Sequence, residues 1–159
     1  MNWDALGAIG EIVGSLAVVI TVAYLAVQIR QGAREARSAA INQSRAAVTD
    51  VLSGISSDTD AADIYFRGLH DLDALSAAER VRFELIIFQM LRVTETMFFE
   101  YQQGVLNEEL WEAQWYGTQN ALRTPGAMAF WKRRNKMLTR SFVTWVEEWL
   151  KTADGFVDP

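Results

Sequence analysis

The stretch IVGSLAVVITVAYLAVQI, residues 12–29, contains no charged side chain and consists mostly of valine, isoleucine, leucine and alanine. A helix of this length spans roughly 27 Å at about 1.5 Å per residue, which matches the hydrocarbon core of a bilayer. We therefore predict that residues 1–30 form a single transmembrane helix. A cleaved signal peptide is disfavoured, because Asp4 stands where a signal peptide carries lysine or arginine, the apolar run is too long and no A-x-A cleavage site ends it. The remaining alternative is a buried hydrophobic hairpin of a soluble protein.

The basic residues give the predicted helix an orientation. All lysines and arginines lie at or after Arg30, and Arg30, Arg34 and Arg37 follow the apolar run directly. Positively charged flanks favour the cytoplasmic side of a membrane. We therefore expect the N-terminus outside and the rest of the chain in the cytoplasm. The same three arginines are candidate contacts for lipid headgroups.

Small residues recur at spacings of three and four along one side of this helix: Gly7, Gly10, Gly14, Ala17 and Thr21. Small side chains let membrane helices approach closely. The stripe predicts self-association into a homo-oligomer through these five residues. The alternative is that glycine and alanine are simply common in membrane helices.

Glu11 is the only ionisable side chain between residues 5 and 29. It either lies at the outer interface among lipid headgroups or forms a ring of carboxylates at the mouth of a pore. In the second case Ser15, Thr21 and Gln28 would be further lumen residues.

The rest of the chain predicts helices and no strands, so the expected fold class is all-α. We expect residues 31–55 to extend the first helix beyond the membrane. Residues 58–152 are predicted to form an antiparallel helical bundle in the cytoplasm, and residues 153–159 a loose tail.

Local signals predict where several of these helices begin and end. Ser76 opens the pattern Ser-Ala-Ala-Glu, which is a capping box at the start of a long helix. Asn107 is the expected N-cap of the next helix. Gly68 and the region of residues 71–73 are expected to end a short helix, and His70, beside Asp71, is expected in a loop. Residues 127–151 are expected to form one continuous amphipathic segment.

Composition argues against several classes of function. The chain has no cysteine and one histidine, and its formal net charge is −5. It therefore offers no thiolate chemistry, no Glu-x-x-His di-iron pairs and no basic face for nucleic acid. We expect no catalytic residue, no cofactor and no metal site, and hence no enzymatic activity.

One basic cluster has two interpretations. Lys132, Arg133 and Arg134 either contact anionic lipid headgroups or form a solvated helix face that pairs with glutamates of a neighbouring helix. A set of tryptophans is expected in the core or in a subunit interface: Trp111, Trp115, Trp131, Trp145 and Trp149.

The chain resembles a family of uncharacterised small bacterial membrane-anchored proteins. The stretches that carry the resemblance are residues 7–14 (GAIGEIVG), 24–31 (YLAVQIRQ) and 99–106 (FEYQQGVL), followed by Trp111 and Trp131. The resemblance implies a bacterial origin, one membrane span and a helical cytoplasmic domain. It implies no activity and no catalytic residue.

Two functions therefore remain open from the sequence. The first is a structural or scaffolding homo-oligomer of the bacterial inner membrane, with membrane lipids and further copies of itself as partners. The second is a small oligomeric ion channel or gated pore formed by the N-terminal helices.

Overall fold

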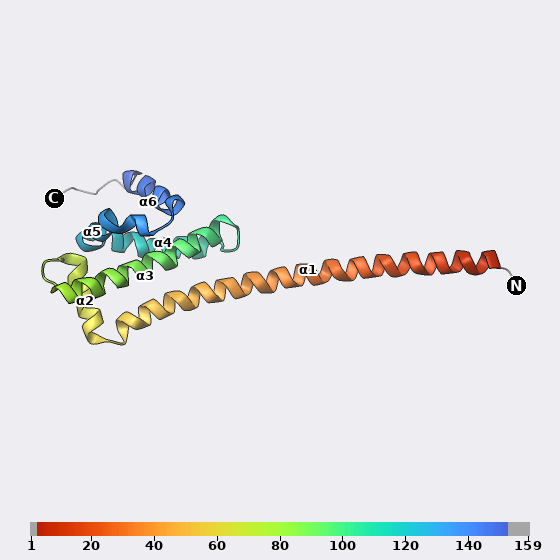
Figure 1. Ribbon diagram of the computed structural model, residues 1–159, viewed down its shortest axis with the longest axis horizontal. Helices are drawn as coiled ribbons and strands as arrows, with labels where there is room; N and C mark the ends of the chain where they lie inside the picture. Colours follow the sequence, from red (N-terminus) through yellow and green to blue (C-terminus); the bar gives the residue numbers. More distant parts are fainter. Residues whose placement is uncertain (1–2, 153–159) are drawn as a thin grey trace. The chain divides into compact units, whose positions relative to one another are not determined.

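The computed structural model describes residues 3–152, and among these the side chains of residue 11 and residues 14–152. This part of the chain contains helices and no strand, which confirms the all-α fold class. Figure 1 shows the elements in chain order: α1 (Trp3–Ser56), α2 (Thr59–His70), α3 (Ala77–Gln102), α4 (Glu108–Leu122), α5 (Pro125–Arg134), the short 3-10 helix η1 (Asn135–Met137) and α6 (Arg140–Thr152).

The chain divides into two compact units, Met1–Ala40 and Ile41–Pro159. Helix α1 is continuous in sequence across this division, so its last turns belong to the second unit. Those turns pack through Ile41 and Val48, which are partly buried against the core of the second unit. We call the second unit the helical domain.

The helical domain is built around α3, whose buried residues are mostly apolar. Phe83, Ile87 and Leu91 are at most 2% exposed, and residues of α4, α5 and α6 complete one continuous core. Burying a large apolar side chain contributes about 1.5–3 kcal/mol, so this core is the main source of the domain's stability.

The tryptophans are part of this core, as one of the two sequence interpretations predicts. Trp111, Trp115 and Trp131 are at most 8% exposed. Trp145 is partly buried, and its ring centroid lies 4.5 Å from that of Trp115 in an edge-on arrangement. Aromatic pairs in this geometry are favourable beyond the area they bury, so the cluster fixes α4 against α6.

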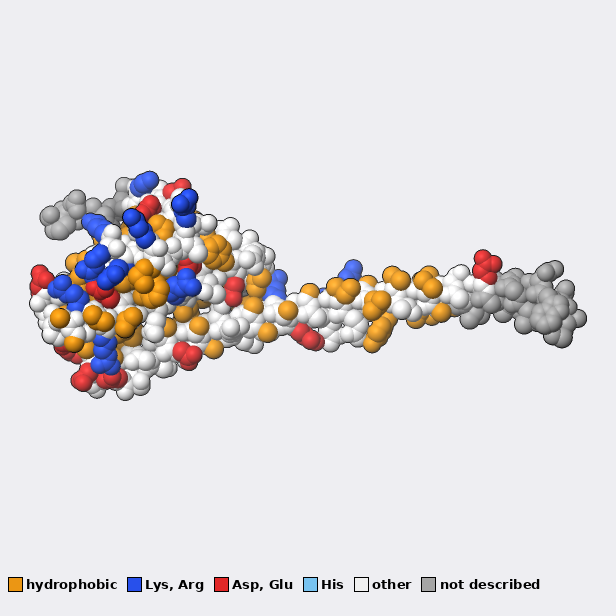
Figure 2. All heavy atoms as spheres, in the orientation of Figure 1, with side chains coloured by type: hydrophobic (Ala, Val, Ile, Leu, Met, Phe, Trp, Pro, Cys, Tyr) orange, Lys and Arg blue, Asp and Glu red, His pale blue; other side chains and the backbone are white. Residues whose placement is uncertain are grey.

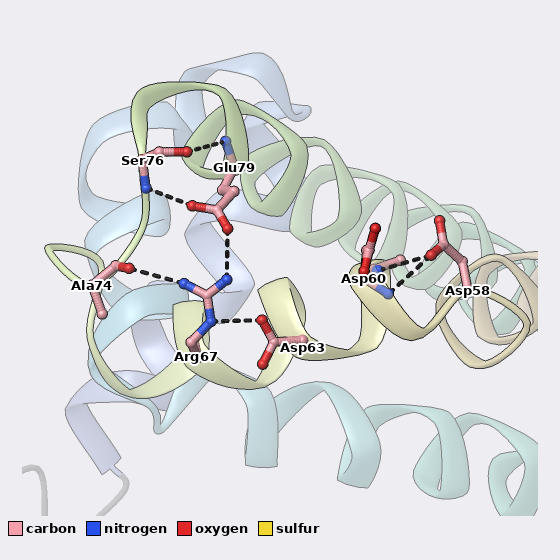
Figure 3. A network of polar contacts seen from close by, with 8 residues as sticks. Asp58, Asp60, Asp63, Arg67, Ala74, Ser76 and Glu79 are labelled. Carbon is pink, nitrogen blue, oxygen red and sulfur yellow. Dashed lines mark hydrogen bonds and ion pairs between the residues drawn. The ribbon is translucent and has the colours of Figure 1, made fainter.

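The predicted helix starts are confirmed. The Ser76 hydroxyl accepts from the Glu79 backbone N–H, and the Glu79 carboxylate accepts from the Ser76 N–H, which is a complete capping box (Figure 3). Asn107 caps α4 by accepting from the Leu110 N–H at 3.0 Å. These caps form because each satisfies N–H groups that have no partner inside the helix.

The expected end of the short helix at residues 71–73 is confirmed, because Asp71 is the C-cap of α2, but the expectation that Gly68 contributes to this end is wrong. Helix α2 continues to His70, which lies in its last turn and not in a loop. Gly68 is buried because α2 and α5 meet there: a Cβ built at Gly126 would lie 1.7 Å from the Gly68 carbonyl oxygen. Gly126 allows the two backbones to come this close, whereas the missing side chain of Gly68 leaves room for the ring of Phe83 in α3, 2.4 Å from where a Cβ would lie. Neither glycine acts as a helix stop.

The expectation of one continuous amphipathic segment over residues 127–151 is also wrong. The chain forms three elements there, α5, η1 and α6, and Thr139 lies between η1 and α6. The Thr139 N–H donates to the Glu95 carboxylate at 2.6 Å, and Leu138 is 7% exposed. The break lets α6 turn so that Phe142 and Val146, both 0% exposed, enter the same core. A straight helix could not bury both segments against α3.

Candidate functional site

One described helix is long and apolar enough to cross a membrane, namely α1 over Gly14–Ser56. All side chains of residues 14–39 are exposed. The large apolar ones include Leu16, Val19 and Ile20, at 60%, 64% and 61% exposure. A core helix of a soluble protein buries such residues, whereas a bilayer solvates them.

The polar side chains of this segment form hydrogen bonds within the same helix. Backbone and side-chain groups that lipid does not solvate must find partners inside the protein. Three contacts meet this requirement: Ser15 Oγ donates to the Glu11 carbonyl at 2.8 Å, Thr21 Oγ1 to the Ala17 carbonyl at 2.8 Å, and Gln28 Nε2 to Tyr24 Oη at 3.0 Å.

The small-residue stripe lies on exposed surface where the structure describes it. Gly14, Ala17 and Thr21 are all exposed, and a Cβ added at Gly14 would meet no atom within 4 Å. The side-chain surroundings of Gly7 and Gly10 lie outside the described residues. Glu11 is exposed next to the described part of the stripe.

The arginines that follow the apolar run, Arg30, Arg34 and Arg37, are exposed on α1. Helix α1 therefore carries an apolar surface followed by a basic one on consecutive turns. This is the order that the positive-inside rule uses to orient a span.

The basic cluster of α5 contacts α3. Arg133 donates to the Glu84 carboxylate, and Arg134 Nε lies 3.6 Å from Glu84 Oε2. Lys132 is exposed. The two arginines thus fit the interpretation as a solvated face paired with a glutamate, while their side chains remain 46% and 50% exposed.

Glu95 is a buried acid that the sequence did not single out as buried. Its side chain is 4% exposed, pairs with Arg92 one helical turn earlier, and accepts the Thr139 N–H. It joins α3 to the start of α6. The only local signal was Arg92 at a spacing of three, which is common on solvated helix faces as well.

An ion-pair network at the junction of α2 and α3 perturbs the pKa of Glu79. Arg67 donates to Glu79 at 2.6 Å, to Asp63 at 2.7 Å and to the Ala74 carbonyl at 2.9 Å (Figure 3). The bond from Arg67, followed by the bonds from Ser76, lowers the pKa of Glu79 to about 2. This network holds the loop between the two helices and points to structure, not to catalysis.

A groove of about 270 Å³ runs between the last turns of α1 and helices α3 and α4. Gln114 and Thr118 give it a polar side. Both side chains bond to the fully buried Thr94: the Thr94 and Thr118 hydroxyls lie 2.7 Å apart, and Gln114 Nε2 donates to Thr94 Oγ1 at 3.0 Å. The rest of the lining is apolar and includes Val48 and Met90. No sequence pattern predicts this groove, because its walls come from three segments that are far apart in the chain.

Among the side chains that the structure describes, those of residue 11 and residues 14–152, no group of three or more histidines, aspartates or glutamates is arranged to hold a metal ion. His70 is exposed, and its ring packs against Phe66 with centroids 5.0 Å apart.

Comparisons with protein-family models, with curated proteins and with solved structures each give no match.

Proposed function

We propose that this protein is a single-pass protein of the bacterial inner membrane that self-associates through α1 and acts as a structural scaffold. The helical domain lies on the cytoplasmic side. The observation that carries the proposal is the surface of α1, where an uninterrupted apolar stretch is exposed along residues 14–29 and is followed directly by arginines.

Self-association is supported by the exposed small residues Gly14, Ala17 and Thr21. In lipid, helices associate through close packing and not through hydrophobic exclusion, so small residues at spacings of three and four favour contact. Because the chain offers one such helix among its described residues, another copy of α1 is the simplest partner.

Topology is tested with the full chain in a bacterial inner membrane. A reporter fused after residue 159 should be active in its cytoplasmic form, and the protein should leave the membrane fraction only with detergent. Recovery of the full chain in the soluble fraction, or a reporter active outside the cytoplasm, would contradict the proposal.

Self-association is tested by the variant Gly14→Ile, because a side chain at this position has no contact within its own chain. Ala23→Ile adds the same bulk on the opposite side of α1 and is the matched control. We expect native mass spectrometry in nanodiscs to show fewer copies for Gly14→Ile and an unchanged number for Ala23→Ile. A monomeric parent protein, or equal stoichiometry in all three chains, would refute the interface. Five or more copies per disc would instead support the pore alternative.

A further inference from the structure

Helix α3 is apolar on its outer side as well as on its inner side. Val81 and Leu85 are 59% and 57% exposed, and Phe88 is half-buried. They follow one another at spacings of four and three, so they form a single stripe along the helix. A helix with apolar residues on opposite sides is normally covered on both, and in the described structure the outer stripe is uncovered.

The chain between α5 and α6 lies alongside this stripe. Arg133 at one end of that segment contacts Glu84, and Thr139 at the other end contacts Glu95 three turns further along α3. Met137, between these two contacts, is 52% exposed. We call the surface formed by Val81, Leu85, Phe88 and Met137 the α3 face.

Positive charge lies along one side of the α3 face, on residues 132–140, and at the end of the stripe, on Arg92. Residues 132–140 contain five basic and no acidic side chains, and Arg92 follows Phe88 on the same side of α3. The acids that pair with this rim are withdrawn from the surface: Glu84 and Glu95 are 16% and 4% exposed, whereas Arg92 is 52% exposed. Figure 2 shows hydrophobic side chains interspersed with lysine and arginine along α3.

We propose that the α3 face docks onto an anionic phospholipid surface, with the apolar stripe in the headgroup region and the basic rim on the phosphates. This inference rests on the proposed function, because an anchored domain meets the bilayer at high effective concentration. Apolar residues beside basic residues are the composition of surfaces that bind anionic membranes. A second copy is a poor occupant, because a two-fold contact would bring two basic rims together.

The test uses the full chain in nanodiscs made either of phosphatidylcholine alone or of phosphatidylcholine with phosphatidylglycerol. The chain has no cysteine, so Val81→Cys introduces one site for an environment-sensitive fluorophore. We expect a blue shift and protection from iodide in the anionic discs only, reversed by high salt. A probe at Tyr116→Cys on α4, where the native side chain is 65% exposed, is the control and should be quenched equally in both discs.

Two sets of variants separate charge from apolar contact. Lys132→Gln with Lys136→Gln removes two cations that make no ion pair among the described residues. Each basic residue near an anionic surface contributes about five-fold, so the docked-to-free ratio should fall roughly 25-fold. Leu85→Gln should abolish protection of the probe, whereas Phe66→Gln, an equally exposed site on α2, should not.

Equal quenching of the Val81 probe in both discs would overturn the proposal. Protection of the probe in detergent that increases with protein concentration would also overturn it, because a second copy would then cover the α3 face. A chain that does not enter the discs would refute the proposed anchor instead. Vesicles of the same two lipid compositions then test the α3 face separately. A blue shift with the anionic vesicles supports it, and no shift overturns it.

Discussion

Replacing Gly126 by alanine should destabilise the helical domain, although alanine is the better helix former. The built Cβ would lie 1.7 Å from the Gly68 carbonyl oxygen, 2.9 Å from the Gly68 carbonyl carbon and 3.2 Å from the Leu69 carbonyl oxygen. All three are backbone atoms of α2, so no side-chain rotation can relieve the overlap. The two helices must separate.

The size of the effect follows from the separation required. Helices α2 and α5 would have to move apart by about 1.5 Å to restore a van der Waals distance. The movement would loosen the contacts of neighbouring residues that are now closely packed, among them Ala127 at 0% exposure. Overpacking of a core typically costs 1–3 kcal/mol, and a backbone overlap belongs at the upper end. We expect a loss of about 3 kcal/mol, only partly offset by a helix-propensity gain of up to about 1 kcal/mol.

Gly117→Ala is the matched control. Gly117 is in the middle of α4, and a Cβ added there would meet no atom within 4 Å. The same substitution should therefore stabilise the domain by about 0.5–1 kcal/mol, through helix propensity and the reduced entropy of the unfolded chain.

Urea denaturation of the full chain in detergent micelles, followed by tryptophan fluorescence, measures both free energies of unfolding. The two variants should move the midpoint in opposite directions with an unchanged slope. If Gly126→Ala is as stable as the parent or more stable, α2 and α5 do not meet at this point, and the packing argument is refuted.

Three further predictions concern polar groups. Because the pKa of Glu79 is lowered from 4.5 to about 2 in the folded chain, the stability it contributes is complete above pH 4.5 and is lost as the pH falls towards 2. The parent should be more stable than Glu79→Gln above pH 4.5 by a constant amount, and this difference should shrink as the pH falls from 4.5 towards 2, as acid titrations of both chains would show. Glu95→Ala should lower the free energy of unfolding by about 1–3 kcal/mol, because the Thr139 N–H before α6 loses its acceptor. Amide hydrogen exchange at the start of α6 should then become faster by a larger factor than exchange in α4. Thr118→Val keeps the side-chain shape and removes a buried hydroxyl pair, so the midpoint in urea should fall by an amount equivalent to about 1 kcal/mol.

Local sequence determined the type of structure and many of its boundaries. The apolar run of residues 12–29, the capping box at Ser76 and the cap at Asn107 each depend on groups a few residues apart. A side chain that bonds to the free N–H groups favours a helix start in any fold. The length of an uncharged run likewise sets the length of apolar helix that it can form, whatever packs beside it. For this reason these features could be predicted without knowing what packs against them.

Only the tertiary structure decided how distant segments meet. Gly68 resembled a helix stop, but its missing side chain makes room for the ring of Phe83 in α3, and the missing side chain of Gly126 lets α5 approach the Gly68 backbone. Residues 127–151 have one continuous apolar periodicity, yet the chain breaks at Thr139 because Glu95 of α3 supplies an acceptor there. The α3 face likewise exists because the segment after Arg133 returns along α3. Close approach and burial depend on which surfaces are opposed, and a local pattern carries no information about the opposing surface.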